Sequence, residues 1–368
     1  MIALITAVFM VFALFLTGCG AKEEKKDGKI EVTDLLGRKV EVPADSKTYA
    51  CLGPGCLRLY SYVADTDKLA GVEDAEISWP ESGRPYTMAL GSKEERAKRK
   101  VIGPGGPKNT ADAEALIEAA PDVIFTRYAS DKAEVDELQQ KTGIPVLAVS
   151  YGDETIFNDD IYKSLELIGK VTRNEKRAKE MVDYLKSNQK DLHDRTKDIK
   201  DRPSVYLGGM SFKGSHGIES TAGDYAIFKA IGADNVIDKT GAKKHVMIDK
   251  EEIINLDPDY IIIDAGGLGI IRDDYKKNPE FYRSLNAFKK GHVYLEMPFN
   301  FYYTNIDTAL ADMYYVGKVL YPEQFKDINP EKKFNEITKK MLGIECYDRM
   351  AKEYYGGYQQ ITLESLAK

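Results

Sequence analysis

Short apolar runs alternate with helical segments along most of the chain from Thr48 onward. Runs such as TYACL, VIFT and PVLAVS are bounded by turn residues, and between them lie stretches with apolar residues every three or four positions. Strands buried on both faces have continuous apolar runs, and the helices that cover them show the 3.6-residue period. The alternation therefore predicts an α/β protein built on parallel sheets.

Two segments depart from this rhythm. Before it, IEVTDLLGRKVEV alternates apolar and polar residues around a Leu-Gly-Arg turn, which predicts a β-hairpin. In its middle, residues 160–200 keep helical spacing as far as Arg202-Pro203 and predict one long helix. The alternation then resumes and closes with an amphipathic helix from Asp307 to Leu320. We thus expect two α/β lobes, residues 30–159 and 201–368, joined by a connecting helix over residues 160–200.

An internal repeat relates the two predicted lobes. Residues 112–122 (DAEALIEAAPD) and 249–259 (DKEEIINLDPD) share Asp, Glu, an apolar pair, Pro and Asp at equivalent positions. The match predicts the same helix-turn-strand unit in both lobes. Two related lobes leave a crevice at the carboxyl ends of their strands, where ligands of open sheets bind.

The amino terminus predicts export. Residues 1–16 are an apolar run shorter than the roughly 20 residues of a membrane-spanning helix, and Leu16-Thr17-Gly18-Cys19 follows directly. This tetrapeptide resembles a bacterial lipobox, which makes residues 1–19 a signal peptide and Cys19 the lipidated residue. Residues 20–29 read as a charged, flexible tether. The protein is then expected to be extracytoplasmic and lipid-anchored to the cell membrane. A core helix that ends at a glycine is the competing interpretation.

Composition narrows the class of protein. The chain has 368 residues, 43% of them hydrophobic and 30% charged, which excludes a disordered, collagen-like or multi-span membrane protein. Its length exceeds what one core usually serves and agrees with two lobes. Acidic and basic residues are mixed and the net charge is −7, which argues against nucleic-acid binding.

Catalytic and metal-binding motifs are missing from the sequence. The four histidines are scattered and form no HExxH spacing: His193, His216, His245 and His292. Ser211, in GGMSFKG, lacks the G-x-S-x-G frame of a nucleophile elbow. We therefore expect a monomeric binding protein without cofactor, resident metal or enzymatic activity. An exported lipoprotein enzyme is the remote alternative.

Three further cysteines leave three possibilities open. Cys51 and Cys56 flank a Leu-Gly-Pro-Gly turn and Cys346 lies far away. The first two could form a disulfide in an oxidising compartment, remain reduced and buried, or act as a thiolate pair for a metal.

Together, the lipobox and tether, the Asp-Leu-Leu-Gly-Arg hairpin, the paired E-x-[LI]-I-x-x-x-P-D segments and the long helix resemble a known family. They are similar to the helical-backbone, or class III, periplasmic binding proteins of bacterial ABC importers. The resemblance covers roughly Ile30 to Leu320. It implies two Rossmann-like α/β lobes joined by one long helix, and capture of an iron-siderophore, haem, corrinoid or related metal complex for delivery to an ABC permease of the iron-complex/cobalamin type.

The resemblance also implies one permease-docking glutamate on each lobe. The matching positions are Glu114 and Glu251. A second interpretation needs no partner, because carboxylates in the first turn of a helix are stabilised by the helix dipole.

Loops that follow strands and face the crevice supply the candidate ligand contacts. Their cations would favour an anionic ligand, and their aromatic rings offer flat apolar area to a macrocycle or catecholate. The candidates are Arg58, Trp79, Arg127, Tyr128, Tyr151, Phe212, Lys213, His216, Phe299, Tyr302 and Tyr303. Each residue also has an ordinary structural interpretation in a turn, helix or loop. A molybdate or tungstate oxyanion is the alternative ligand.

Overall fold

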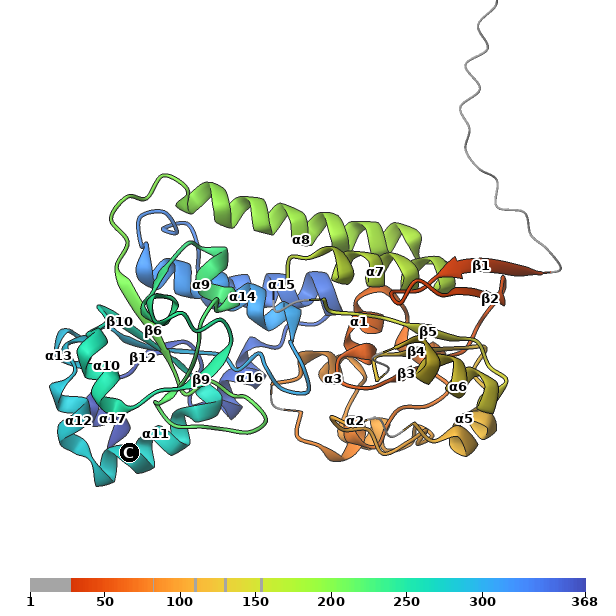
Figure 1. Cartoon of the computed structure of the whole chain (residues 1–368), viewed down its shortest axis with the longest axis horizontal. Coiled ribbons are helices and arrows are strands. Elements are labelled where there is room, and N and C mark those ends of the chain that lie inside the picture. Colours follow the sequence, from red (N-terminus) through yellow and green to blue (C-terminus); the bar gives the residue numbers. More distant parts are fainter. Residues whose placement is uncertain (1–27, 82, 109–110, 129–130, 153–154) are drawn as a thin grey trace, which may run out of the picture.

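The computed structural model describes residues 28–368 except 82, 109–110, 129–130 and 153–154 (Figure 1). The predicted signal peptide, Cys19 and tether residues 20–27 lie outside the described residues. Lys29, which the sequence assigns to the tether, already belongs to the first strand.

The predicted hairpin is confirmed. Strand β1 (Lys29–Thr33) pairs antiparallel with β2 (Lys39–Pro43). In the turn, Arg38 Nη1 lies 2.9 Å from Asp34 Oδ2 and donates to the carbonyl of Val146, also at 2.9 Å. Both charged side chains are buried, so the Asp-Leu-Leu-Gly-Arg motif clasps the hairpin onto the first sheet.

The first lobe is built on a parallel sheet of order β3-β4-β5. Its strands β3 (Tyr49–Leu52), β4 (Val123–Thr126) and β5 (Val146–Ala148) are buried throughout, as their apolar runs predict. Around it lie α1 (Cys56–Val63), η1 (Thr66–Lys68), α2 (Ala75–Ser78), α3 (Pro85–Ala89), α4 (Lys93–Arg96), α5 (Ala113–Ala119) and α6 (Lys132–Thr142).

The second lobe has a five-stranded sheet of order β12-β11-β10-β6-β8. Strands β6 (Ser204–Gly208), β8 (Asp234–Asn235), β10 (Tyr260–Asp264) and β11 (Val293–Glu296) run parallel, and β12 (Gln359–Gln360) is antiparallel. A separate pair joins β7 (Ser220–Ala222) to β9 (His245–Met247). The helices of this lobe are α9 (Ala226–Ala230), η2 (Val236–Thr240), α10 (Lys250–Leu256), η3 (Ala265–Gly267), α11 (Leu268–Lys277), α12 (Pro279–Ser284) and α13 (Asn286–Lys290).

One long helix, α8 (Glu175–Thr196), joins the lobes as predicted, but the bounds predicted for it, residues 160–200, are wrong. The chain forms α7 (Asp159–Thr172) and α8, because Arg173 takes a left-handed conformation with φ 59° and ends α7. Gly169 lets the two helices pack closely, since a Cβ there would lie 2.4 Å from that of Ala178. Helical spacing continues through the break, which is why the sequence pattern missed it.

The lobes are joined by more than α8. Helix α14 (Ile306–Leu320) matches its prediction, but the chain continues into α15 (Pro330–Leu342), α16 (Tyr347–Glu353), β12 and α17 (Leu363–Leu366). Helix α15 packs on α14 and also contacts α1 and α3 of the first lobe. Arg177 of α8 donates to the carbonyl of Met341 in α15 at 3.1 Å. These contacts fix the two lobes against each other.

The internal repeat is confirmed as one structural unit used twice. Helices α5 and α10 each end at a left-handed residue, and β4 and β10 follow. Asp122 Oδ2 accepts from the backbone N–H of Thr48 at 2.9 Å, and Asp259 Oδ2 accepts from that of Ser204 at 3.0 Å. The Pro-Asp pair of the repeat therefore anchors the start of the neighbouring strand in each sheet.

Cys51, Cys56 and Cys346 are free thiols and all are buried. Burial raises the pKa of the Cys51 thiol, and neighbouring Cys56 raises it further. Among the described residues, no group of three His, Cys, Asp or Glu side chains is placed to hold a metal ion. The sequence left three possibilities open for Cys51 and Cys56, and the structure agrees with the second, in which both thiols are reduced and buried.

Candidate functional site

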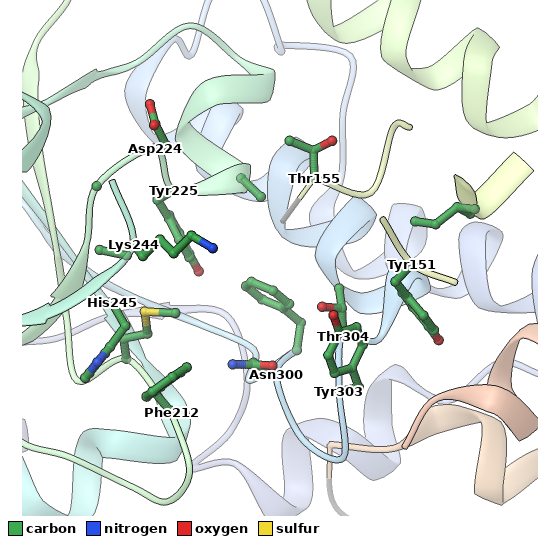
Figure 2. A pocket seen from close by; sticks show the side chains of 16 residues that line it. Tyr151, Thr155, Phe212, Asp224, Tyr225, Lys244, His245, Asn300, Tyr303 and Thr304 are labelled. Atoms are coloured by element: carbon green, nitrogen blue, oxygen red, sulfur yellow. The ribbon is translucent and has the colours of Figure 1, made fainter. Parts of the chain in front are cut away.

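A cavity of about 470 Å³ lies where the two lobes meet. The first lobe contributes the loop after β5 and the start of α7, and the second contributes loops that follow β6, β7 and β11 (Figure 2). Six aromatic rings line it, those of Tyr151, Phe212, Tyr225, His245, Phe299 and Tyr303. Aliphatic and polar residues complete the wall: Thr155, Ile161, Met210, Ala222, Gly223, Asp224, Ala226, Lys244, Asn300 and Thr304.

The loop between β11 and α14 forms one wall of this cavity in a strained conformation. Tyr302 and Tyr303 both have positive φ, 52° and 74°, which bulky side chains rarely adopt. The fully buried Asn305 compensates for this, because its Nδ2 donates to the carbonyls of Phe299 at 2.9 Å and Phe301 at 3.0 Å. The sequence did not predict this role of Asn305, because an Asn before a helix is typical of an N-cap.

Arg58 holds the same loop from the first lobe. Its side chain is completely buried and donates from Nε to Asn305 Oδ1 at 2.8 Å. Its other nitrogens donate to the carbonyls of Thr304 at 2.9 Å and Tyr302 at 3.1 Å. The structure therefore gives Arg58 an interlobe structural role in place of the predicted ligand contact, because its guanidinium is already occupied by protein acceptors.

The predicted ligand residues divide into three groups. Tyr151, Phe212, Phe299 and Tyr303 line the cavity. Arg127 and His216 contact lining residues from outside it. Trp79 and Tyr302 pack on each other with ring centroids 5.1 Å apart, Tyr128 lines a separate cavity beside α6, and Lys213 is exposed. The structure thus brings the aromatic set together, whereas the four predicted cations stand behind the lining in two pairs. Arg58 and Arg127 contact Tyr151, and Lys213 and His216 contact Phe212.

Arg127 stands behind the aromatic wall. Its guanidinium lies 3.4 Å from the centroid of Tyr303 and 5.5 Å from that of Tyr151, and Nη1 donates to the carbonyl of Pro54 at 3.1 Å. A cation over these rings fixes their planes and brings positive charge to the edge of the cavity.

Replacing Arg127 by Ala is therefore expected to weaken ligand binding about tenfold, through loss of ring orientation and charge. The matched variant Lys213→Ala should lose less affinity, because the Lys213 ammonium is exposed to solvent and lies 5.4 Å from a single lining ring, that of Phe212. Calorimetric titration of both variants checks this. An equal loss of affinity in both variants, or a loss only in Lys213→Ala, would instead support recognition of an anionic ligand by the loop cations.

Two histidines extend the aromatic wall in the second lobe. His245 stacks on Phe212 with ring centroids 4.3 Å apart, and His216 lies 5.8 Å from His245. Ser220 Oγ donates its proton to the Met210 carbonyl, so the His245 nitrogen 3.0 Å away must be the donor. Burial, with His216 nearby, lowers the pKa of His245. At neutral pH His245 is thus a neutral imidazole whose Nδ1 remains an acceptor.

Several lining residues escaped the sequence analysis. Lys244 and His245 lie on the short strand β9 and its approach, in a lysine-rich segment that reads as an exposed turn. Asp224 and Tyr225 precede α9. The repeat offers no guide to these positions, because they fall outside it. Only the glycine preceding Asp224, at Gly223, signals a close backbone approach.

A buried carboxylate supports the floor of the cavity. Tyr225 donates its hydroxyl to Glu296 Oε1, and Glu296 Oε2 and Asp312 Oδ2 are buried without a hydrogen-bond partner in the part of the chain that the structure describes. Burial raises the pKa of Glu296 to about 8, so Glu296 holds a proton at neutral pH.

A second buried carboxylate, Glu73, contacts the strained loop from the first lobe. Glu73 Oε2 accepts from the N–H of Gly53 at 2.9 Å and from the hydroxyl of Tyr302 at 3.2 Å. Burial raises the pKa of Glu73 to about 7 from an ordinary value of 4.5. Such a group binds its proton more tightly in the folded chain, so it favours folding below pH 4.5 and this contribution is lost as the pH rises to 7.

Glu73→Gln is therefore expected to stabilise the protein at pH 8 by about 1–3 kcal/mol and to change little at pH 5. Urea unfolding of variant and parent at both pH values isolates this effect from that of Glu296. The same stability difference at pH 5 and pH 8 would contradict the assignment.

Two α/β lobes joined by packed helices, with an aromatic cavity where they meet, are the arrangement of a solute-binding protein. A family model described as "Periplasmic binding protein" matches residues 50–297, more than half of the chain. The chain belongs to this family and is a substrate-binding protein of an ABC transporter with the class III fold. Proteins of this family are extracytoplasmic solute-binding proteins that work with a permease. The described helices include none that is both long and apolar enough to span a membrane.

The related proteins are named for different ligands. The chain is 24% identical to the uncharacterised ABC transporter substrate-binding lipoprotein YvrC of Bacillus subtilis, over 88% of this chain and 98% of YvrC. It is 24% identical to the molybdate-binding protein MolA of Haemophilus influenzae, over 84% and 90%. The Fe(3+)-citrate-binding protein YfmC of Bacillus subtilis is 23% identical, over 79% and 87%. A periplasmic solute-binding protein from Veillonella parvula has the same fold, with a TM-score of 0.69, 19% identity and coverage of 89% and 96%.

Proposed function

We propose that this protein captures a metal complex of an organic chelator, of the iron-siderophore, haem or corrinoid class, in the cavity between its lobes. The aromatic lining of a cavity of about 470 Å³ carries this proposal. Ligand cavities for small organic molecules commonly measure about 300–1,000 Å³ and are mostly apolar with a few polar groups. Flat rings such as those of Tyr151, Phe299 and Tyr303 suit a chelate with exposed organic surface.

An oxyanion such as molybdate or tungstate is the second candidate. Lys244, at the cavity wall, and Arg127 behind it supply positive charge, and MolA is a molybdate-binding relative. A bare tetrahedral oxyanion needs several convergent hydrogen-bond donors in a small site. Several lining donors are already used within the protein, since Tyr151, Tyr225 and Asn300 donate to Gly55, Glu296 and Ser211. We therefore prefer the chelate.

A fluorescence titration separates the two candidates. Trp79 is the one tryptophan of the sequence and its ring lies 5.1 Å from that of Tyr302, next to the loop that lines the cavity. We expect saturable changes with ferric citrate, a ferric hydroxamate, haemin or a corrinoid, and none with molybdate or tungstate. Binding of the oxyanions alone would replace the chelate proposal with the second candidate.

We also propose that Cys19 carries a lipid and anchors the protein to the outer face of the cell membrane. The lipobox-like Leu16-Thr17-Gly18-Cys19 and the lipoprotein relative YvrC support this. Replacing Cys19 by Ala should release the full-length protein into the medium or periplasm, because the folded lobes supply no other membrane attachment in this proposal. Fractionation followed by immunoblotting checks it, and a variant still in the membrane fraction would contradict it.

A further inference from the structure

Two isoleucines are exposed at equivalent positions of the internal repeat. Ile117 on α5 is 51% exposed and Ile254 on α10 is 43% exposed. Their neighbours Leu116 and Ile253 are completely buried and attach the helices to the sheets. In each lobe, one residue of the apolar pair is therefore buried and the other is exposed.

The repeat contains positions with an internal role and positions without one. Asp122 and Asp259 hold the neighbouring strands, as described above. Glu114 and Glu251 are exposed, and their side chains have no hydrogen bond or ion pair within the described part of the chain. The aspartates of the repeat thus have hydrogen-bond partners within the fold. The glutamates gain only from the dipole of their helices, and the exposed isoleucines pack into neither core.

On each helix the glutamate and the isoleucine are three residues apart and lie side by side on the surface. We call Glu114 with Ile117, and Glu251 with Ile254, the paired docking patches. A partner that buries such a patch has to offer a cation to the carboxylate and an apolar surface to the isoleucine, because an uncompensated buried charge is costly. Because the two patches are chemically alike, they fit a partner that presents two equivalent surfaces.

We propose that Ile117 and Ile254 are permease-docking residues, each packing into an apolar depression next to the permease cation that meets the glutamate of its lobe. This inference rests on the partnership of the family with an ABC permease and on the docking role expected of Glu114 and Glu251, and it adds a contact that charge alone does not provide. An exposed isoleucine contributes most to binding when its side chain is removed from water at the centre of an interface.

The test measures binding to the cognate permease, purified in nanodiscs, by biolayer interferometry. The double variant Ile117→Gln/Ile254→Gln should bind at least about tenfold more weakly, since Gln keeps helix propensity but removes the apolar group. Ile117→Leu/Ile254→Leu should bind like the parent. Ile270→Gln is the matched control, because Ile270 on α11 is also 43% exposed but lies outside the repeat.

Salt separates the isoleucine contribution from that of the glutamates. Raising the salt from 0.15 to 0.5 M should weaken binding by the parent, whereas the fold difference between parent and Gln variant should persist, because apolar contacts are not screened. Melting temperature and ligand titration should be unchanged in every variant. Normal binding by the Gln variant, or an equal loss in Ile270→Gln, would overturn the inference. Failure of the parent itself to bind any ABC permease would instead reject the permease partnership.

Discussion

Replacing Arg58 by Met is expected to lower the free energy of unfolding by about 3–5 kcal/mol and to abolish tight ligand binding. The change leaves Asn305 Oδ1 and the carbonyls of the strained loop without their donor in a buried site. Burial raises the pKa of Asp307, and the change also removes the Arg58 charge that opposes this rise. Urea unfolding and ligand titration of the same preparation measure both effects.

Two further variants make this result specific. Arg58→Lys should be nearly as damaging, since an ammonium group cannot reproduce the fork of hydrogen bonds. Arg283→Met, which removes an exposed arginine paired with Glu280, should change stability by no more than about 0.5 kcal/mol. A variant of Arg58 that loses ligand affinity but unfolds like the parent would make Arg58 a ligand contact after all.

Reversing the charge of Glu114 and Glu251 to Lys is expected to abolish uptake of the labelled ligand by whole cells. Ligand affinity and melting temperature should stay near those of the parent, because both side chains are exposed and far from the cavity lining. Glu252→Lys, a change one residue away on α10, is the control and should support uptake. Loss of ligand affinity in the double variant would place these glutamates in the binding site and reject their docking role.

Much of the fold could be predicted because short stretches of the sequence indicate both the buried strands and the repeated unit. Continuous apolar runs gave the buried parallel strands, and the match between residues 112–122 and 249–259 gave two related units. The break between α7 and α8 could not be predicted in this way. It depends on one left-handed residue, Arg173, within a pattern whose helical spacing continues on both sides.

The site was predicted less completely, because loop residues are selected by tertiary contacts. Phe299 and Tyr303 were predicted from their aromatic character and from their place in a loop that follows a predicted strand. Arg58 looked identical to a ligand-binding cation in the sequence, and only the carbonyls around its guanidinium show that it serves the fold. His245 and Lys244 were missed because they reach the cavity from a strand of three residues and the turn before it.

Native mass spectrometry with metal analysis, applied to the protein isolated from its own cell, tests whether the aromatic cavity captures a metal chelate. We expect a stoichiometric adduct that contains a metal and an organic chelator, and that is lost when Phe299 and Tyr303 are both replaced by Ala. A metal-free adduct, or a tetrahedral oxyanion retained by that variant, would contradict capture of a metal chelate by the aromatic cavity.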